Sequence, residues 1–212
     1  MSNKPEKILL IAYACAPDKG AEPGNGWGWA VHLAKKGYNV WCLTNIEDKE
    51  YIISQKEKSG LTNLEFVFVS LNFGLDKKLL NTSSKKIYIH YALWQHKAFS
   101  IAEKLHQQQH FDIAHHVSFG SMQQGTFIGK LKHVKKIFGP VGGGQRAPDT
   151  LKQYFGKAWR TEQLRSFISG YSVKYSSRLK NTVLHCDHIL VSNLDTAALA
   201  KQVKGCNPQK ID

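Results

Sequence analysis

Two neighbouring histidines stand in the segment FDIAHHVS, residues 111–118, where an apolar run ends. His115 and His116 are candidate catalytic residues, because an imidazole can take up or release a proton near neutral pH. Adjacent residues of a strand point to opposite faces of a sheet, so the pattern leaves open which of the two lines a cleft. A structural hydrogen-bonding role is the alternative. Ser118, at the end of the same run, is a candidate substrate-binding residue.

A first glycine-rich segment, CAPDKGAEPGNGWGW at residues 15–29, follows the first apolar run of the chain. Gly24, Asn25 and Gly26 precede or open a helical pattern, where free backbone N–H groups and the helix dipole favour an anion. We take them as candidate substrate-binding residues, with turn geometry alone as the alternative. A dinucleotide fingerprint would need glycine where Trp29 stands, which argues against a nicotinamide-dependent enzyme.

A second glycine-rich segment, FGPVGGGQRAP at residues 138–148, is the most unusual in the chain. Three consecutive glycines between two prolines should leave backbone amides open to a ligand, and an arginine adds a fixed positive charge. The candidate substrate-binding residues here are Gly142, Gly143, Gly144 and Arg146. The histidine pairs at 106/110 and 185/188 lack a third ligand at a suitable spacing, so we predict no metal site, and we predict no cofactor.

The elements that must position these residues alternate between short apolar runs and helical patterns. The runs predict six strands, at residues 7–14, 38–44, 64–70, 111–117, 134–138 and 188–193. The helical patterns lie at about 27–36, 48–58, 85–109, 150–183 and 195–204, and residues 71–84 are predicted as a loop. Continuous apolar strands alternating with helices predict one α/β domain with a Rossmann-like, doubly wound parallel sheet. Ligands of such sheets bind at the carboxyl ends of the strands.

The charge of the chain is uneven. The whole chain has a net charge of +13, and the excess lies in residues 77–180, which carry 18 basic and 4 acidic side chains, a sum of +14, with aromatic residues between them. Such a stretch suits an anionic membrane surface or a polyphosphate, with a solvated basic face as the alternative. Nucleic acid is disfavoured as a partner, because no signature of a nucleic-acid-binding module occurs.

The location of the protein is indicated by the apolar runs and the cysteines. No apolar run approaches the roughly 20 residues that a membrane span requires. The run at residues 8–16 resembles a signal peptide, but we interpret it as a buried strand because glycines and a helical pattern follow it. The four cysteines form no CxxC pair. They indicate reduced core residues in a cytoplasmic protein, with peripheral docking at the inner face of the membrane left open.

Four segments together resemble the N-terminal half of the GT-B glycosyltransferases of the large retaining family four. They are, in chain order, KILLIAYACAPDKGAEPGNGWGWAVHLAKKGYNVWCLT, FDIAHHVSFGS, IFGPVGGGQRAP and CDHILVSNLDTAALAK. The resemblance implies a Rossmann-like acceptor-side domain over residues 1–212, without the donor-binding domain. It implies that Gly24, Asn25 and Gly26 approach the donor phosphates and the acceptor. A histidine after a D-x-x-H pattern, which matches Asp112 and His115, would lie in the cleft near the transferred sugar.

Two departures from the family pattern bear on function. Members with D-x-x-H-x-H carry a second histidine where this chain has Val117, so the roles of His115 and His116 stay open. The family's E-x7-E motif belongs to the donor-binding domain, and the same spacing between Glu57 and Glu65 is interpreted as coincidence.

The resemblance implies a retaining hexosyltransferase of polysaccharide biosynthesis. The full enzyme would move a sugar from a nucleotide-sugar to a saccharide or lipid-linked acceptor, and we expect this chain alone to be inactive. The alternative is a stand-alone binding module for anionic ligands, phosphorylated compounds or nucleic acid, without catalysis. Steep salt dependence of oligonucleotide binding would favour that alternative.

Overall fold

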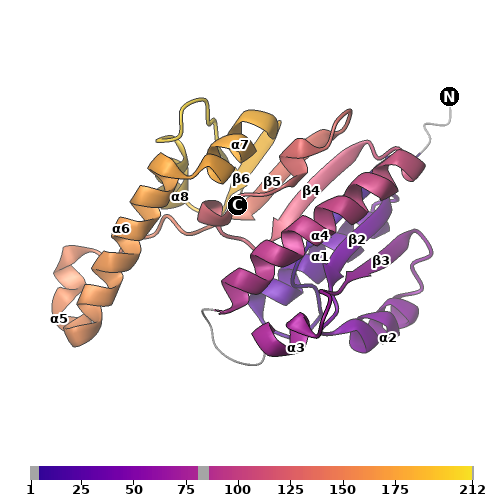
Figure 1. Cartoon of the computed structure of the whole chain (residues 1–212), viewed down its shortest axis with the longest axis horizontal. Coiled ribbons are helices and arrows are strands. Elements are labelled where there is room, and N and C mark those ends of the chain that lie inside the picture. The colour runs from indigo at the N-terminus through magenta and orange to yellow at the C-terminus, as the bar shows by residue number, and fades with distance from the viewer. Residues whose placement is uncertain (1–4, 81–85, 212) are drawn as a thin grey trace.

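Seven parallel strands form one sheet in the order β3-β2-β1-β4-β5-β6-β7 in the computed structural model, which describes residues 5–80 and 86–211 (Figure 1). The six predicted strands are confirmed. A seventh strand of two exposed polar residues was not predicted, because it has no apolar pattern. The strands are β1 (Lys7–Ala12), β2 (Asn39–Asn45), β3 (Leu64–Val69), β4 (Ile113–Ser118), β5 (Lys135–Val141), β6 (His188–Val191) and β7 (Gln209–Lys210).

Eight α-helices connect and cover these strands within the described residues. They are α1 (Ala21–Lys35), α2 (Lys49–Ser59), α3 (Leu75–Leu80), α4 (Lys86–Gln109), α5 (Lys152–Phe155), α6 (Trp159–Tyr175), α7 (Ser177–His185) and α8 (Leu194–Ala200). Short 3-10 turns are η1 (Met122–Gln124), η2 (Ile128–Lys130), η3 (Asp149–Leu151) and η4 (Gly156–Ala158). None of the helices in 5–80 and 86–211 is long and apolar enough to cross a bilayer.

Three helix predictions need correction. The helix expected from residue 27 begins at Ala21. Pro23 does not prevent this earlier start, because the backbone N–H groups of the first helical turn make no hydrogen bond within the helix and proline lacks only that group. The predicted loop at 71–84 contains α3, and its residues 81–84 lie outside the described part of the chain. The region predicted as one helix at 150–183 is broken at Gly156 and Ser176, neither of which has a helical backbone conformation.

The apolar side chains of the strands alternate between the two faces of the sheet. Leu9 and Ile11 pack with Tyr91 and Trp94 of α4 on one face. Leu10, Ala12 and Cys42 pack with Ala30 and Ala34 of α1 on the other. A third cluster joins β5 and β6 to α7 and α8. Helices therefore cover both faces, as the doubly wound prediction requires.

One part of the chain projects from this body. Figure 1 shows α5 and the adjoining end of α6 extending away from the sheet, beyond the loop that follows β5. Because all strands are parallel, this loop lies at the same edge of the sheet as the loops after β1 and β4. That edge holds the three segments singled out by the sequence.

Candidate functional site

Backbone hydrogen bonds join the three loops at the carboxyl edge of the sheet. The N–H of Tyr13, after β1, donates to the carbonyl of Ser118 at 3.0 Å. The N–H of Gly142, after β5, donates to the carbonyl of Gly120 at 2.8 Å, and Gly120 in turn donates to Glu22 Oε1 at 2.8 Å. The loops that the sequence predicts at one edge are therefore in direct contact.

The two candidate catalytic histidines point to opposite faces of the sheet, as predicted. His115 Nε2 donates to the carbonyl of Gly139 at 2.7 Å, and its ring forms a T-shaped contact with Trp29 with 4.8 Å between centroids. His116, on the α4 face, lies 2.8 Å from Thr126 Oγ1 through Nδ1 and 3.1 Å from the Tyr91 hydroxyl through Nε2. Both side chains make hydrogen bonds within the domain.

Burial sets the protonation state of both histidines. His115 is 4% exposed and His116 is 1% exposed. Removal from water penalises the charged imidazole and lowers the pKa of His115 to about 4. The same cause, together with the neighbouring His115, lowers the pKa of His116 to about 3. Both rings are therefore neutral at pH 7, and a catalytic role for either stays a prediction.

Ser118 ties the β1 loop to the end of β4. Its side chain is fully buried, and its Oγ donates to the carbonyl of Ala14 at 3.0 Å while accepting from the Ala14 N–H at 3.2 Å. The hydroxyl thus satisfies both backbone groups of one loop residue.

The candidate glycines of the first segment lie in the opening turns of a helix, since residues 15–20 precede α1 and residues 21–29 belong to it. Gly24, Asn25 and Gly26 belong to the first turns of α1, and the N–H of Gly24 donates to the carbonyl of Gly20 at 3.0 Å. The expectation of a free amide at Gly24 is therefore wrong. A Cβ at Gly26 would lie 2.2 Å from the carbonyl oxygen of Ala14, so glycine lets α1 approach the β1 loop. Asn25 is exposed on α1.

The amides of the second glycine segment are also occupied. Gly142 donates to Gly120, Gly143 donates to Gln145 Oε1 at 3.1 Å, and Gly144 donates to Thr196 Oγ1 at 3.1 Å. The expectation that these three amides are open to a ligand is wrong. A Cβ at Gly144 would lie 2.4 Å from the Cα of Thr196, so the glycine allows the loop to pack against the start of α8.

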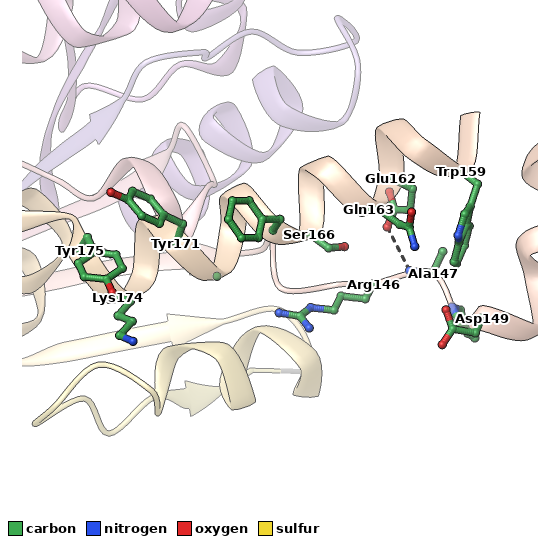
Figure 2. A pocket seen from close by; sticks show the side chains of 13 residues that line it. Arg146, Ala147, Asp149, Trp159, Glu162, Gln163, Ser166, Tyr171, Lys174 and Tyr175 are labelled. Carbon is green, nitrogen blue, oxygen red and sulfur yellow. Dashed lines mark hydrogen bonds between the residues drawn. The ribbon is translucent and has the colours of Figure 1, made fainter. Parts of the chain in front are cut away.

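Among the candidate binding residues of this segment, Arg146 is the one that is not a glycine, and its side chain is open. It is exposed and lines a groove of about 910 Å³ between residues 146–149 and α6 (Figure 2). Lys174 extends to the same side of α6 in this view. Aromatic side chains complete the wall at Phe167, Tyr171 and Tyr175, whose rings follow one another with 6.4 and 4.6 Å between centroids.

An ion pair holds one wall of the groove. Glu162 Oε1 accepts from the N–H of Ala147 at 3.1 Å, and Arg165 donates to both carboxylate oxygens of Glu162 at 2.8 and 2.7 Å. The Arg165 hydrogen bonds lower the pKa of Glu162 to about 2. Arg165 also donates to the carbonyl of Gln145 at 2.5 Å. The segment before Pro148 is thereby attached to α6.

The other side of α6 borders a second groove of about 710 Å³, where the apolar side chains of Leu164 and Ile168 stand beside polar ones. Its wall includes Tyr88, Ser121, Gln123 and Arg165. Gln123 Nε2 donates to the carbonyl of Gly143 at 2.7 Å and also contacts Ser169 Oγ. α6 therefore separates a cationic, aromatic groove from a groove of mixed polarity next to the sheet edge.

Of the residues that line the cationic groove, sequence reasoning selected only Arg146. The missed signal is the spacing of Phe167, Tyr171 and Tyr175 at four-residue intervals, which places three rings on one side of a helix. What the groove can do follows from its chemistry. Arg146 and Lys174 form no ion pair with an acidic side chain among the described residues, and they lie beside aromatic rings. Such a groove suits a ligand in which an anionic group is attached to a ring or to an apolar group.

A buried chain of polar side chains also escaped sequence reasoning. His90 Nε2 lies 2.7 Å from Asp76 Oδ1, and His90 Nδ1 lies 2.8 Å from the Tyr13 hydroxyl. Burial raises the pKa of Tyr13 far above its usual value, and the nearby carboxylates add to the shift. These residues are distant in sequence, so no local motif marks them. They connect α3 and α4 to the end of β1.

No group of three or more histidine, cysteine or acidic side chains within 5–80 and 86–211 is arranged to hold a metal ion. The fold defines a class, the Rossmann-like α/β domains with an all-parallel sheet. Beyond that class, no model of a known protein family matches the chain, and no curated protein is similar to it.

Proposed function

We propose that this chain is the acceptor-side domain of a retaining GT-B glycosyltransferase. One observation supports the proposal above others. Three of the segments that carry the resemblance follow β1, β4 and β5, and they meet at the carboxyl edge of a Rossmann-like sheet. This edge is where α/β domains bind their ligands.

The acceptor contacts come from side chains in this proposal, because the glycine amides are engaged inside the domain. Arg146 and Lys174 would bind a phosphate of a lipid-linked acceptor, and the rings of Tyr171 and Tyr175 would contact sugar or lipid. His115 and His116 would position the β4 loop as neutral hydrogen-bonding groups.

Transfer itself requires more than this domain. The leaving phosphate and the anomeric carbon develop opposite charges, which fixed dipoles and cations must stabilise. In the resembling enzymes a second α/β domain binds the nucleotide-sugar and supplies much of that environment. The chain alone is therefore expected to show negligible transfer.

The experiment that tests this proposal is to read the coding frame beyond Asp212 and to assay its complete product with a panel of nucleotide-sugars. A second α/β domain with an E-x7-E motif and transfer by the complete product are expected. A stop codon directly after Asp212, or robust transfer by residues 1–212 alone, would overturn the proposal.

A second candidate function is a binding module for anionic ligands without catalysis. The observation that favours it is that Arg146 and Lys174 line one groove. Of the two acidic residues of that groove, Asp149 and Glu162, the second is already engaged by Arg165. Calorimetric titration with inorganic pyrophosphate and with oligonucleotides separates the two functions. Tight binding of either one, in a chain that no second domain follows, selects the module.

A further inference from the structure

The projecting part of the chain concentrates exposed apolar side chains. Eight of the fifteen large apolar side chains that are exposed among the described residues lie within 151–175, a segment that we call the arm. Isolated exposed apolar residues are ordinary on a protein surface, but a contiguous patch marks a surface that meets a partner. The concentration of exposed apolar side chains in the arm therefore indicates a surface that contacts a partner.

On α6 these side chains form a single stripe. Its members are spaced three, four, seven and eleven residues from the first, so they share one face of a helix with 3.6 residues per turn. The opposite face, at Trp159, Ser169 and Val173, is buried against the rest of the chain. The apolar stripe therefore lies opposite the buried face, between the two grooves that α6 separates, and consists of Leu164, Phe167, Ile168, Tyr171 and Tyr175.

The arm is also strongly cationic. It contains five basic residues and one acidic residue, Glu162, which is already paired with Arg165. The four other basic residues, Lys152, Lys157, Arg160 and Lys174, are exposed. Arg160 and Lys174 stand near the two ends of the stripe. Long cationic side chains in such positions can reach past an apolar surface to an anionic one.

From these observations we propose that the arm docks on the surface of an anionic lipid bilayer. The apolar stripe lies at the boundary between headgroups and acyl chains, where tyrosine is favoured because its ring is apolar and its hydroxyl polar. Arg160, Lys174 and the lysines of α5 and η4 contact lipid phosphates. The proposal rests on the arm and does not depend on glycosyl transfer.

Charge favours a bilayer over a second copy of the chain as the occupant. Two arms facing each other would bring eight cations together, four from each arm. Their mutual repulsion would oppose the contact, because an interface that excludes water screens charges less than solvent does. An anionic bilayer offers the opposite charge over the whole length of α6. The side chains of the stripe are exposed, so replacing them leaves the core of the domain intact.

Co-sedimentation of the chain with lipid vesicles tests the proposal. We expect binding to phosphatidylcholine vesicles that contain about 30% phosphatidylglycerol, and binding at least about tenfold weaker to phosphatidylcholine alone. Raising the salt concentration should weaken the first interaction, because the cations are exposed to solvent. Equal binding to the two kinds of vesicle, or none to either, would overturn the proposal.

Paired variants separate the arm from the general charge and apolarity of the chain. Phe167→Ser with Ile168→Ser should weaken vesicle binding by more than about tenfold. Phe73→Ser, at an aromatic residue that is 91% exposed outside the arm, should leave it unchanged. Arg160→Gln with Lys174→Gln should weaken binding roughly 25-fold, at about a fivefold loss for each cation. Lys35→Gln with Lys58→Gln removes the same charge elsewhere and is the control.

Each remaining outcome decides against the bilayer. A stripe variant that binds like the parent, or control variants that lose as much as the arm variants, would remove the arm from the interaction. A dimer seen by light scattering that Phe167→Ser and Ile168→Ser abolish would assign the stripe to a second copy instead. Transfer activity enters none of these measurements, so failure here is distinct from failure of the proposed function.

Discussion

The carboxyl edge of the sheet and the arm use their residues in opposite ways. At the edge, the residue types that suggest chemistry are turned inward: His116, Ser118 and Gly144 each bond to a neighbouring loop or helix. In the arm, side chains such as Phe167 and Lys174 are open to solvent. Residues that resemble a site in the sequence hold the loops together, while the open surface consists of ordinary apolar and basic residues.

The largest difference between the two regions should appear on truncating a phenylalanine. Phe138 is fully buried in β5, whereas Phe167 is 69% exposed on α6. Phe138→Ala should lower the free energy of unfolding by about 4 kcal/mol, since it leaves a cavity. Phe167→Ala should change it by no more than about 0.5 kcal/mol. Urea unfolding measures both, and similar losses would mean that the arm belongs to the core.

Two glycines of α1 offer a sharper contrast within one motif. Gly26→Ala should destabilise the fold by about 3 kcal/mol, because the added Cβ meets the Ala14 carbonyl. Gly28→Ala places its Cβ in open space on the same helix, so it should stabilise by about 0.5–1 kcal/mol. Thermal unfolding of the two variants checks the signs. A stable Gly26→Ala variant would show that α1 does not require this close approach.

Acid should weaken the edge through its histidines. Because the folded-state pKa values of about 4 and about 3 lie below the unfolded value, the unfolded chain binds more protons as the pH falls from about 6.5. Above pH 6.5 the histidines are neutral in both the folded and the unfolded chain, so they do not lower the free energy of unfolding there. At pH 5 each histidine should have lowered the free energy of unfolding by about 2 kcal/mol relative to pH 7. His116→Gln should flatten the decline in unfolding free energy between pH 7 and 5, and an unchanged slope would contradict the assignment.

A smaller effect is expected from the buried polar chain. Tyr13→Phe removes the hydroxyl partner of His90 Nδ1 and should cost about 1.5 kcal/mol, because a buried polar group loses its hydrogen bond. Tyr154→Phe is the control, since Tyr154 is 77% exposed on the arm and should lose nothing measurable. Denaturant midpoints measured at pH 7 compare the two. Equal stability of both variants would show that the chain from Asp76 to Tyr13 adds nothing.

The strands could be predicted because their apolar runs are continuous, as burial of both faces demands. The start of α1 could not, since three glycines lower helix propensity and only packing against the β1 loop explains one of them. For the candidate site, the sequence predicted that His115 and His116 face opposite ways. It could not predict that both are buried, because covering residues such as Trp29 and Tyr91 come from distant helices.

By itself, the sequence determined the class of fold, the alternation of strands and helices, and the excess of positive charge between residues 77 and 180. These depend on local patterns of apolar and charged residues. Only the tertiary structure decided that the glycine amides are occupied and that Arg146 opens into a groove. It also decided that the apolar side of α6 faces outward. Each of these depends on what lies across a contact between segments far apart in the chain, and no local pattern records that.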